Sequence, residues 1–266
     1  MTNRIGSLFA GIGGLELGLE WAGVGHTIWQ VERDPWARSI LAKHWPDVPR
    51  YDDVRTVTAA TVSPIEVLCG GFPCQDLSFA GKGAGLGGAR SGLFFELMRI
   101  VDELGPRFIV LENVSAILSR GLDVVLGRLA QSGYDAWWDC VPASACGAMH
   151  RRDRWFLVGH TEGKRGVGGV QRSERAGWSG PLGDGRCVCG QRADAQPRMG
   201  GNPDGLPLGL DRYPKGVGPD QHPFEPPRVH EEAPDDADRL RGLGNAVVPQ
   251  VGFVIGKALL QIMEST

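Results

Sequence analysis

The sequence lacks a long hydrophobic run and a disulfide framework. No stretch of about 18 or more uncharged apolar residues occurs, so a membrane-spanning helix is not expected. Residues 1–15 contain four glycines and are followed by Glu16, which favours a strand and loop over a signal peptide. The six cysteines show no framework spacing, which is typical of reduced thiols and predicts a cytoplasmic location.

The sequence also lacks a strong net charge. Its formal value of −3 neither requires nor excludes nucleic acid, because a local basic face can coexist with an acidic remainder. Glycine and proline are abundant, with 40 and 18 residues among 266, which is too many for a helical bundle. They indicate a chain rich in turns and close backbone approaches. The length suits one sizeable α/β core with a small appendage, or one long domain.

A glycine-rich turn stands near the start of the chain. Residues 5–9 form a short apolar run that predicts a strand, and residues 15–21 have the spacing of a helix packed on a sheet. The turn between them, residues 10–14, would let a ligand approach the backbone at the helix N-terminus. A nicotinamide-binding fingerprint would place a third glycine where Glu16 stands, so the pattern departs from that kind of site.

Acidic residues follow the next two expected strands. The strand predicted over residues 26–31 ends in Glu32, whose carboxylate could accept hydrogen bonds from both hydroxyls of a ribose. A solvated glutamate at a strand end is the alternative interpretation. Asp53 lies at a third acidic strand end, over residues 51–54, where it could meet an adenine amino group. A turn-forming aspartate is equally compatible with the sequence at that position.

Cys74 is the candidate nucleophile. Residues 67–69 are typical of a buried strand, which Gly70 and Gly71 are expected to break, so that the cysteine stands in a loop at the carboxyl edge of the strand. Pro73 fixes the backbone directly before the thiol. A rigidly held, half-exposed thiol suits a nucleophile. Cys74 taken alone is more simply a small packing cysteine in a turn, and only the other motifs favour the reactive role.

A second polar residue pair is expected at the same sheet edge. Residues 76–91 are rich in glycine and have no apolar periodicity, which predicts a flap that could close over a substrate. Residues 92–104 have the spacing of a helix with one buried face. The strand predicted over residues 108–111 then delivers Glu112 and Asn113 to the edge that holds the candidate nucleophile.

Cations cluster further along the chain. After a helix predicted over residues 118–129, Arg151, Arg152 and Arg154 precede a strand predicted over residues 155–158. Three arginines at the start of a strand could bind an anion, and a solvated basic turn is the alternative.

The composition changes between residues 160 and 236. This stretch is rich in glycine and proline and has no helix-length pattern, so we expect a loop-built small domain or a partly disordered insertion. Its basic part, residues 164–198, has the residue types that contact phosphates and base edges. Cys187 and Cys189 have the wrong spacing and no second pair for structural zinc. A core pattern then resumes, with Pro249 opening an apolar-striped helix.

Taken in order, these motifs resemble those of the DNA cytosine C5-methyltransferase family. They are Phe9-Ala-Gly11-Ile-Gly13-Gly14, Glu32, Asp53, Gly71-Phe-Pro73-Cys74-Gln75, Glu112-Asn113-Val114, Arg152-Asp-Arg154 and Gly244-Asn245-Ala246-Val247-Val248-Pro249. The resemblance covers roughly residues 4–159 and 237–266. The Pro-Cys-Gln and Glu-Asn-Val blocks in this order are highly specific together.

The resemblance implies a fold, a cofactor and partners. It implies an α/β protein with a Rossmann-like, S-adenosylmethionine-dependent methyltransferase sheet and a small, loop-rich target-recognition region. Residues 1–159 would form the catalytic domain, residues 160–236 the target-recognition region, and residues 237–266 a segment completing the catalytic domain. The substrate would be a flipped cytosine in double-stranded DNA. A cognate restriction endonuclease is a further expected partner, and we expect a monomer.

The resemblance also implies roles for individual residues. Cys74 would be the nucleophile, Glu112 would contact cytosine N3, and Arg152 and Arg154 would help to hold the base and the nearby backbone. No metal site is expected. The positions that match cofactor contacts in the family are Phe9, Gly11, Gly13, Glu32, Asp53, Pro73, Leu93 and Asn245.

Two departures from the family pattern and two alternative functions stay open. His150 stands where the family usually has glutamine, and Ser7 stands where an acidic residue often faces the amino-acid end of the cofactor. A DNA-binding homologue that has lost catalysis would usually lack the cysteine or the glutamate, and neither is missing. A tRNA cytosine C5-methyltransferase on the same scaffold is compatible with these residues. The sequence recognised in DNA does not follow from them.

Overall fold

The structure is a computed structural model that describes residues 2–73, 92–119, 121–148, 150–162 and 236–265. The candidate nucleophile Cys74, the expected flap over residues 76–91 and the cysteine pair Cys187 and Cys189 lie outside the described residues. Nearly all of the expected target-recognition region lies outside them as well.

The described residues form one mixed sheet of seven strands in the order β3-β2-β1-β4-β5-β7-β6. Strands β1 to β5 run parallel, whereas β7 is antiparallel to both β5 and β6. The strands are β1 (Asn3–Leu8), β2 (Gly25–Val31), β3 (Arg50–Tyr51), β4 (Val67–Gly71), β5 (Phe108–Val114), β6 (Asp135–Pro142) and β7 (Asp153–His160).

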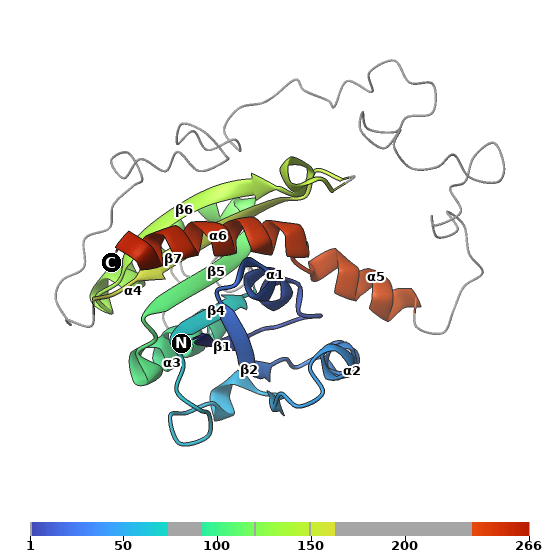
Figure 1. The fold of residues 1–266 in the computed structure, drawn as a ribbon, viewed down its shortest axis with the longest axis horizontal. Coiled ribbons are helices and arrows are strands. Elements are labelled where there is room, and N and C mark those ends of the chain that lie inside the picture. Colours follow the sequence, from blue (N-terminus) through green and yellow to red (C-terminus); the bar gives the residue numbers. More distant parts are fainter. Residues whose placement is uncertain (1, 74–91, 120, 149, 163–235, 266) are drawn as a thin grey trace, which may run out of the picture.

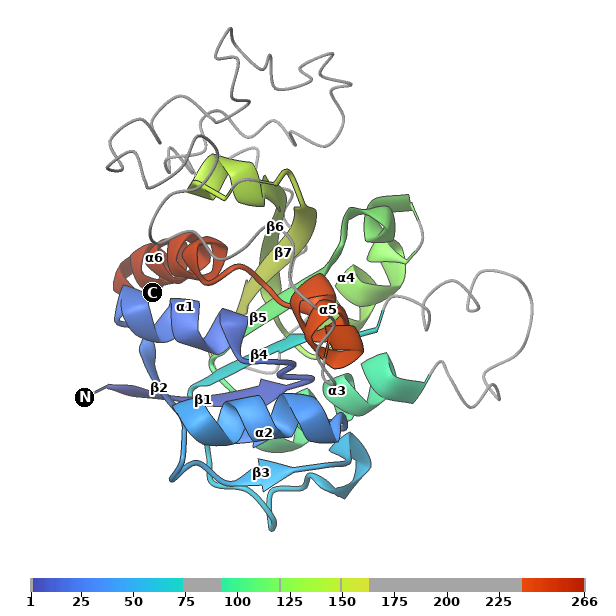
Figure 2. The same cartoon turned by 90° about the vertical axis from the view of Figure 1, so that its right-hand side faces the viewer.

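Helices cover both faces of this sheet. Helices α1 and α6 lie side by side on one face, and α3 and α4 lie on the other (Figure 2). This arrangement confirms the predicted Rossmann-like α/β class. The helices are α1 (Gly14–Ala22), α2 (Pro35–His44), α3 (Gly92–Leu104), α4 (Leu122–Gln131), α5 (Asp236–Asn245) and α6 (Pro249–Ser265), with short 3₁₀ turns η1 (Val54–Thr56), η3 (Ser115–Ser119) and η4 (Ala143–Cys146).

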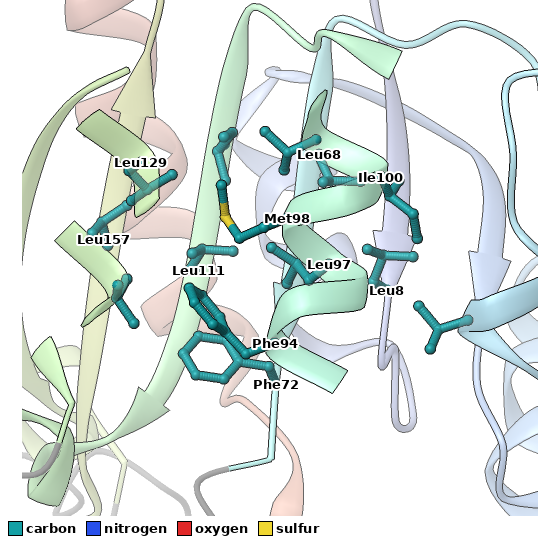
Figure 3. Packing of buried hydrophobic residues seen from close by; sticks show 14 of the residues in the cluster. Leu8, Leu68, Phe72, Phe94, Leu97, Met98, Ile100, Leu111, Leu129 and Leu157 are labelled. Carbon is teal, nitrogen blue, oxygen red and sulfur yellow. The ribbon is translucent and has the colours of Figure 1, made fainter. Parts of the chain in front are cut away.

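Strand β5 divides the hydrophobic core into two layers. Its side chains alternate, so that Phe108 and Val110 join the core under α1 and α6, while Ile109 and Leu111 join the core under α3 and α4. Figure 3 shows the side chains of α3 packed around Leu111 in the second layer. Because both faces are buried, the strand is a continuous apolar run, which explains why it was predictable from the sequence.

Strand β4 continues through the two glycines that were expected to end it. Gly70 and Gly71 pair with Leu111 and Glu112 of β5. A Cβ atom on Gly70 would lie 2.4 Å from the carbonyl oxygen of Leu8 on β1, so only glycine fits this close approach. The expectation of a strand break was therefore wrong, and the strand carries the chain two residues closer to Cys74.

One helical prediction needs correction, and one helix was missed. The helix expected over residues 118–129 is instead the turn η3 followed by α4, with Gly121 at the N-cap and a positive φ of 130°. Helix α2 was not predicted, although its signals are present in the sequence. Asp34 caps the helix by accepting hydrogen bonds from the amides of Trp36 and Ala37, and Pro35 occupies the first turn.

The segment Ala237–Ser265 is long and apolar enough to cross a membrane by length and composition alone. It forms two helices, α5 and α6, which are separate in Figure 1. Helix α6 packs tightly on α1 through glycines, because a Cβ atom on Gly18 would lie 2.4 Å from the carbonyl oxygen of Pro249. One face of α6 is therefore buried against α1 in the core.

Candidate active site

A cavity of about 600 Å³ lies at the carboxyl edge of the parallel strands. Its walls come from the ends of β1, β2, β4 and β5, from the start of α1, and from α5. Ligands of open α/β sheets bind at this edge, because the loops that follow the strands converge there. The cavity is therefore the candidate active site.

Most of the residues expected to contact the cofactor line this cavity. The exception is Gly13, which faces Trp45, since a Cβ atom on Gly13 would lie 2.4 Å from that indole ring. The neighbouring Gly14 lines the cavity instead. The expected residues that do line it are Phe9, Gly11, Glu32, Asp53, Pro73, Leu93 and Asn245.

The turn between β1 and α1 is held in an unusual backbone conformation. Phe9 has a φ of 56°, and Gly11 and Gly13 have φ values of 56° and 88°. A left-handed conformation is costly for a bulky residue such as Phe9 and persists only where the surrounding structure imposes it. Strain of this kind is typical of ligand-binding turns, and here it folds the backbone around one end of the cavity.

Glu32 is fixed by the main chain on both sides of its carboxylate. Oε2 accepts a hydrogen bond from the amide of Gly11 at 2.8 Å, and Oε1 accepts one from the amide of Asp34 at 2.7 Å. Each carboxylate oxygen has a second acceptor site. The residue can therefore still accept two hydroxyl donors from a ligand, in a direction set by the protein.

Asp53 has the turn-forming role that was one interpretation of its position, and it also lies at the cavity. Its Oδ1 accepts a hydrogen bond from the amide of Arg55 at 3.0 Å and so caps the turn η1. The same residue lines the cavity. A capped turn holds the carboxylate in place, so the structural role supports its availability to a ligand.

Glu112 and Arg154 form a buried ion pair at the other end of the cavity. The Nε atom of Arg154 lies 2.8 Å from Oε1 of Glu112, and Glu112 is only 8% exposed. Burial raises the pKa of the Glu112 carboxyl to about 7, while the positive charges of Arg154 and Arg152 act in the opposite direction. A carboxyl group with this pKa exchanges a proton near neutral pH, which suits general acid catalysis.

Asn113 anchors the chain that leads to Cys74. Its side-chain amide donates a hydrogen bond to the carbonyl oxygen of Phe72 at 2.9 Å, and its Oδ1 accepts one from the amide of Val114. Pro73 follows Phe72, lines the cavity and is the last described residue before Cys74. Pro73 and Glu112 thus line the same cavity.

The two arginines of the Arg-Asp-Arg motif have different surroundings. Arg154 reaches Glu112 and lines the cavity, whereas Arg152 does not line it. The guanidinium of Arg152 donates hydrogen bonds to the carbonyl oxygens of Leu243 and Gly244 at 2.9 and 2.6 Å. Arg152 therefore ties the start of β7 to the end of α5, close to the cavity residue Asn245.

The sequence analysis missed a buried carboxyl group in the cavity wall. Glu16, in the first turn of α1, is 1% exposed and lines the cavity beside Ser7. The hydroxyl of Ser7 donates a hydrogen bond to Oε1 of Glu16. Burial raises the pKa of the Glu16 carboxyl to about 7. The sequence signal that could have identified Glu16 was its position at the start of the helix that follows the glycine-rich turn.

Replacing Glu16 with glutamine should stabilise the ligand-free protein above neutral pH. The pKa of Glu16 is higher in the folded than in the unfolded chain, so the cost of its burial is absent below about pH 4.5 and complete above about pH 7. We expect the free energy of unfolding to rise by about 3 kcal/mol at pH 8 and to change little at pH 4.5. Urea unfolding at both values measures this.

Glu66→Gln is the matched control for this stability measurement. Arg4 pairs with Glu66 at 2.7 Å and lowers the pKa of that carboxyl, so its ionised form is favoured in the folded state. The glutamine substitution there should lose stability at pH 8, with the opposite sign. Equal effects of Glu16→Gln at the two pH values would contradict the assigned cost of burying that charge.

Comparisons with known proteins identify the family to which the chain is similar. The family model described as C-5 cytosine-specific DNA methylase matches residues 3–175. Type II methyltransferase M.CviJI of Paramecium bursaria Chlorella virus IL3A is 36% identical over 161 residues, covering 59% of this chain and 43% of that protein. Type II methyltransferase M.AquIA of Picosynechococcus sp. is 31% identical over 185 residues, covering 62% of this chain and 74% of that protein.

A solved structure shares the fold. A DNMT2 mutant from Spodoptera frugiperda matches with a TM-score of 0.53 and 18% sequence identity, over 64% of this chain and 54% of that one. Several curated relatives are longer than the part that matches. The chain spans 41% to 51% of four of them, or about half of their length.

Proposed function

Because the chain belongs to the C-5 cytosine-specific DNA methylase family, we propose that it is a DNA (cytosine-5-)-methyltransferase acting on a flipped cytosine in a specific DNA sequence. The observation that supports this most strongly is the buried pair of Glu112 and Arg154. It lies in the same cavity as Glu32 and Asp53, and beside Pro73, the residue that precedes the proposed nucleophile Cys74.

The cavity wall fits S-adenosylmethionine as the cofactor. Glu32 presents two fixed oxygens to a ribose diol, and Asp53 presents a carboxylate to an adenine amino group. Phe9 and Leu93 offer apolar surface, and Gly11 lets the ligand approach the backbone. When bound, the cofactor supplies a methyl group on a positively charged sulfur.

The first chemical step forms a bond between the Cys74 sulfur and cytosine C6. Cytosine C5 is a poor nucleophile, and addition of the thiolate at C6 makes it electron-rich. Glu112, protonated near neutral pH, gives its proton to N3 and so neutralises the charge that the addition pushes onto the ring. Arg154 holds the Glu112 carboxyl, and we propose that it also reaches O2 of the base.

The second step restores the aromatic ring. The electron pair of C5 would form a bond to the methyl carbon while the bond from that carbon to the cofactor's sulfur breaks and its electrons neutralise the sulfur. A base then removes the C5 proton. The electrons of that C–H bond reform the C5–C6 double bond, the thiolate of Cys74 leaves C6, and N3 returns its proton to Glu112. Arg152 is proposed to act with Arg154 on the base and the nearby backbone, from its position between β7 and α5.

The substrate base must leave the duplex for these steps. Extrusion costs a few kcal/mol, which contacts with the protein have to recover. We propose that residues 160–236 provide those contacts as the target-recognition region, and that residues 237–266 complete the catalytic domain. Double-stranded DNA is the proposed partner, and a cognate restriction endonuclease is a further one.

Bisulfite sequencing of DNA from cells that express the chain tests the function and identifies the target. We expect bisulfite to convert the cytosines of this DNA except for one cytosine within a short recurring sequence. Incubation with labelled cofactor and either DNA or tRNA then separates the alternatives. Label on tRNA alone would mean that the substrate is tRNA and not DNA. Absence of label from both nucleic acids would indicate a DNA-binding homologue without catalytic activity.

Gly71→Ala should impair the reaction while leaving the fold intact. A Cβ atom at this position would lie 2.6 Å from Oε2 of Glu112, so the carboxyl group must move away from its pairing with Arg154. We expect the rate of methyl transfer to fall about 10-fold or more, because general acid catalysis depends on position. Single-turnover methylation measures the rate, and circular dichroism checks the fold.

Gly127→Ala in α4 is the control for this substitution. A Cβ atom there meets no other atom within 4 Å, so the change is neutral for the site. Equal rates for Gly71→Ala and the unmodified protein would mean that the Glu112 carboxyl is free to shift without loss of function.

Reversing charges within residues 164–198 should weaken DNA binding and flatten its salt dependence. The slope of log K against log salt concentration is negative, and each lost phosphate contact reduces its magnitude by about 0.9. Titrations of labelled duplex DNA at several salt concentrations measure this for Arg172→Glu combined with Arg175→Glu. The exposed Lys43, away from this segment in sequence, serves as a control through Lys43→Glu. An unchanged slope would refute this DNA-binding role.

A further inference from the structure

The Glu16 carboxyl is incompletely satisfied in the described part of the chain. Oε1 accepts the hydroxyl of Ser7, but Oε2 is buried without a hydrogen-bond partner among the residues that the structure describes. Buried polar atoms without partners are rare in folded proteins and call for an explanation. Because Glu16 lines the cavity, a bound ligand can supply the missing partner.

The surroundings of Glu16 favour a cationic ligand group. No arginine, lysine or histidine of the described residues forms an ion pair with it, and the nearby carboxylates Glu20 and Glu32 repel its charge. On β4, next to Ser7, burial keeps the pKa of the Cys69 thiol well above its usual value, so this thiol is neutral. A positively charged ligand group would offset the cost of burying this carboxylate beside other negative charges.

The position of Glu16 in the sheet indicates which part of the ligand it meets. Ser7, which holds it, is on β1, between β2, which leads to Glu32, and β4, which leads to Pro73. The ribose of the cofactor is proposed to lie at Glu32 and the reacting methyl group near Glu112. The aminoacyl chain branches from the sulfur between these two points, and its free end has an ammonium group.

We propose that Oε2 of Glu16 receives the α-ammonium group of the cofactor's aminoacyl end, and that the hydroxyl of Ser7 positions the carboxyl for this contact. The proposal rests on the proposed function, because it needs an S-adenosyl ligand in the cavity. Glu16 is thus a binding residue and Ser7 a positioning residue. The carboxylate from α1 supplies the negative charge, and the neutral hydroxyl at position 7 fixes its orientation by a hydrogen bond.

Calorimetric binding of two ligands tests the contact without any methyl transfer. S-adenosylhomocysteine has the ammonium group, whereas 5′-methylthioadenosine lacks the whole aminoacyl chain. For Glu16→Gln we expect binding of S-adenosylhomocysteine to weaken about 10- to 100-fold, as for the loss of a charged hydrogen bond, and binding of 5′-methylthioadenosine to stay within about 2-fold. Ser7→Ala should weaken binding of S-adenosylhomocysteine by a smaller factor and leave binding of 5′-methylthioadenosine unchanged.

Glu32→Gln is the matched control, because both ligands have the ribose. It should weaken both by the same factor. If Glu16→Gln weakens binding of both ligands equally, or of neither, the proposed contact is wrong. Failure of the unmodified protein to bind either ligand would overturn the proposed function itself and the contact with it.

The pH dependence gives a second readout. The groups that face Glu16 are Ser7 on β1, Cys69 on β4, Glu20 on α1 and Glu32 after β2. Since the ammonium group needs the ionised carboxylate, binding of S-adenosylhomocysteine should strengthen between pH 6 and pH 8 and release a proton at the lower pH. In Glu16→Gln this change should disappear. A pH dependence that is equal in both proteins would refute the contact.

Discussion

Replacing Cys74 with alanine should reduce methyl transfer to background, a loss of about 10⁴-fold or more, as for other removed nucleophiles. Without the sulfur no bond to C6 forms, and C5 stays too electron-poor to accept the methyl group. Binding of S-adenosylhomocysteine should be unchanged, because the proposed cofactor contacts come from other residues. Single-turnover methylation and calorimetry on the same preparation measure the two quantities.

Cys146→Ala is the control for this experiment, since Cys146 is a free, partly buried cysteine in η4. It should retain normal transfer. A second readout uses DNA with 5-fluorocytosine at the target, where fluorine prevents loss of the C5 substituent. The unmodified protein should remain attached to this DNA on a denaturing gel, and Cys74→Ala should not. Transfer by Cys74→Ala at a normal rate would rule out the covalent step.

Glu112→Gln should lower the rate of transfer by about 10² to 10³-fold, the range for loss of one group that stabilises a developing charge. Glutamine fills the same space and can still face Arg154, but it has no proton to give to N3. In the unmodified protein, the protonated carboxyl is present below about pH 7 and is lost as the pH rises further, because burial raises its pKa to about 7. Activity should therefore decline above that pH.

The pH profile of Glu112→Gln should lack this declining limb. Rates measured from pH 5.5 to pH 9 at saturating cofactor and DNA compare the two proteins. Glu103→Gln is a suitable control, because Glu103 pairs with Arg99 on the outer side of α3, outside the residues that line the cavity. If the declining limb persists in Glu112→Gln, another group donates the proton.

The sheet was largely predictable because its strands are buried on both faces. Strands β4 and β5 are continuous apolar runs, which the sequence displays directly. Their full length was not predictable. Glycine normally disfavours strands, yet Gly70 continues β4 because it lies against the backbone of β1. Asn113 stays in β5 because it pairs with Trp155 of β7, and its side chain also binds the carbonyl oxygen of Phe72.

The location of a candidate site residue was predictable where it directly follows a strand. Glu32 and Asp53 follow strands and line the cavity as expected. Glu16 was missed because its burial depends on how α1 packs on the sheet, which places the carboxyl beside the hydroxyl of Ser7 on β1. Arg152 was grouped with Arg154 by spacing. It lies just before β7 with a φ of 36°, and its guanidinium binds the end of α5 without lining the cavity.

The pairing of α1 with α6 affects how the chain can fold during synthesis. Lys257 of α6 donates a hydrogen bond to the carbonyl oxygen of Ala22 at the end of α1, across a separation of 235 residues. At about 5 to 20 residues per second, a ribosome needs on the order of tens of seconds to produce the partner of α1. Over that period the apolar side of α1 lacks its cover on the nascent chain, so chaperone capture is expected to protect this half of the core.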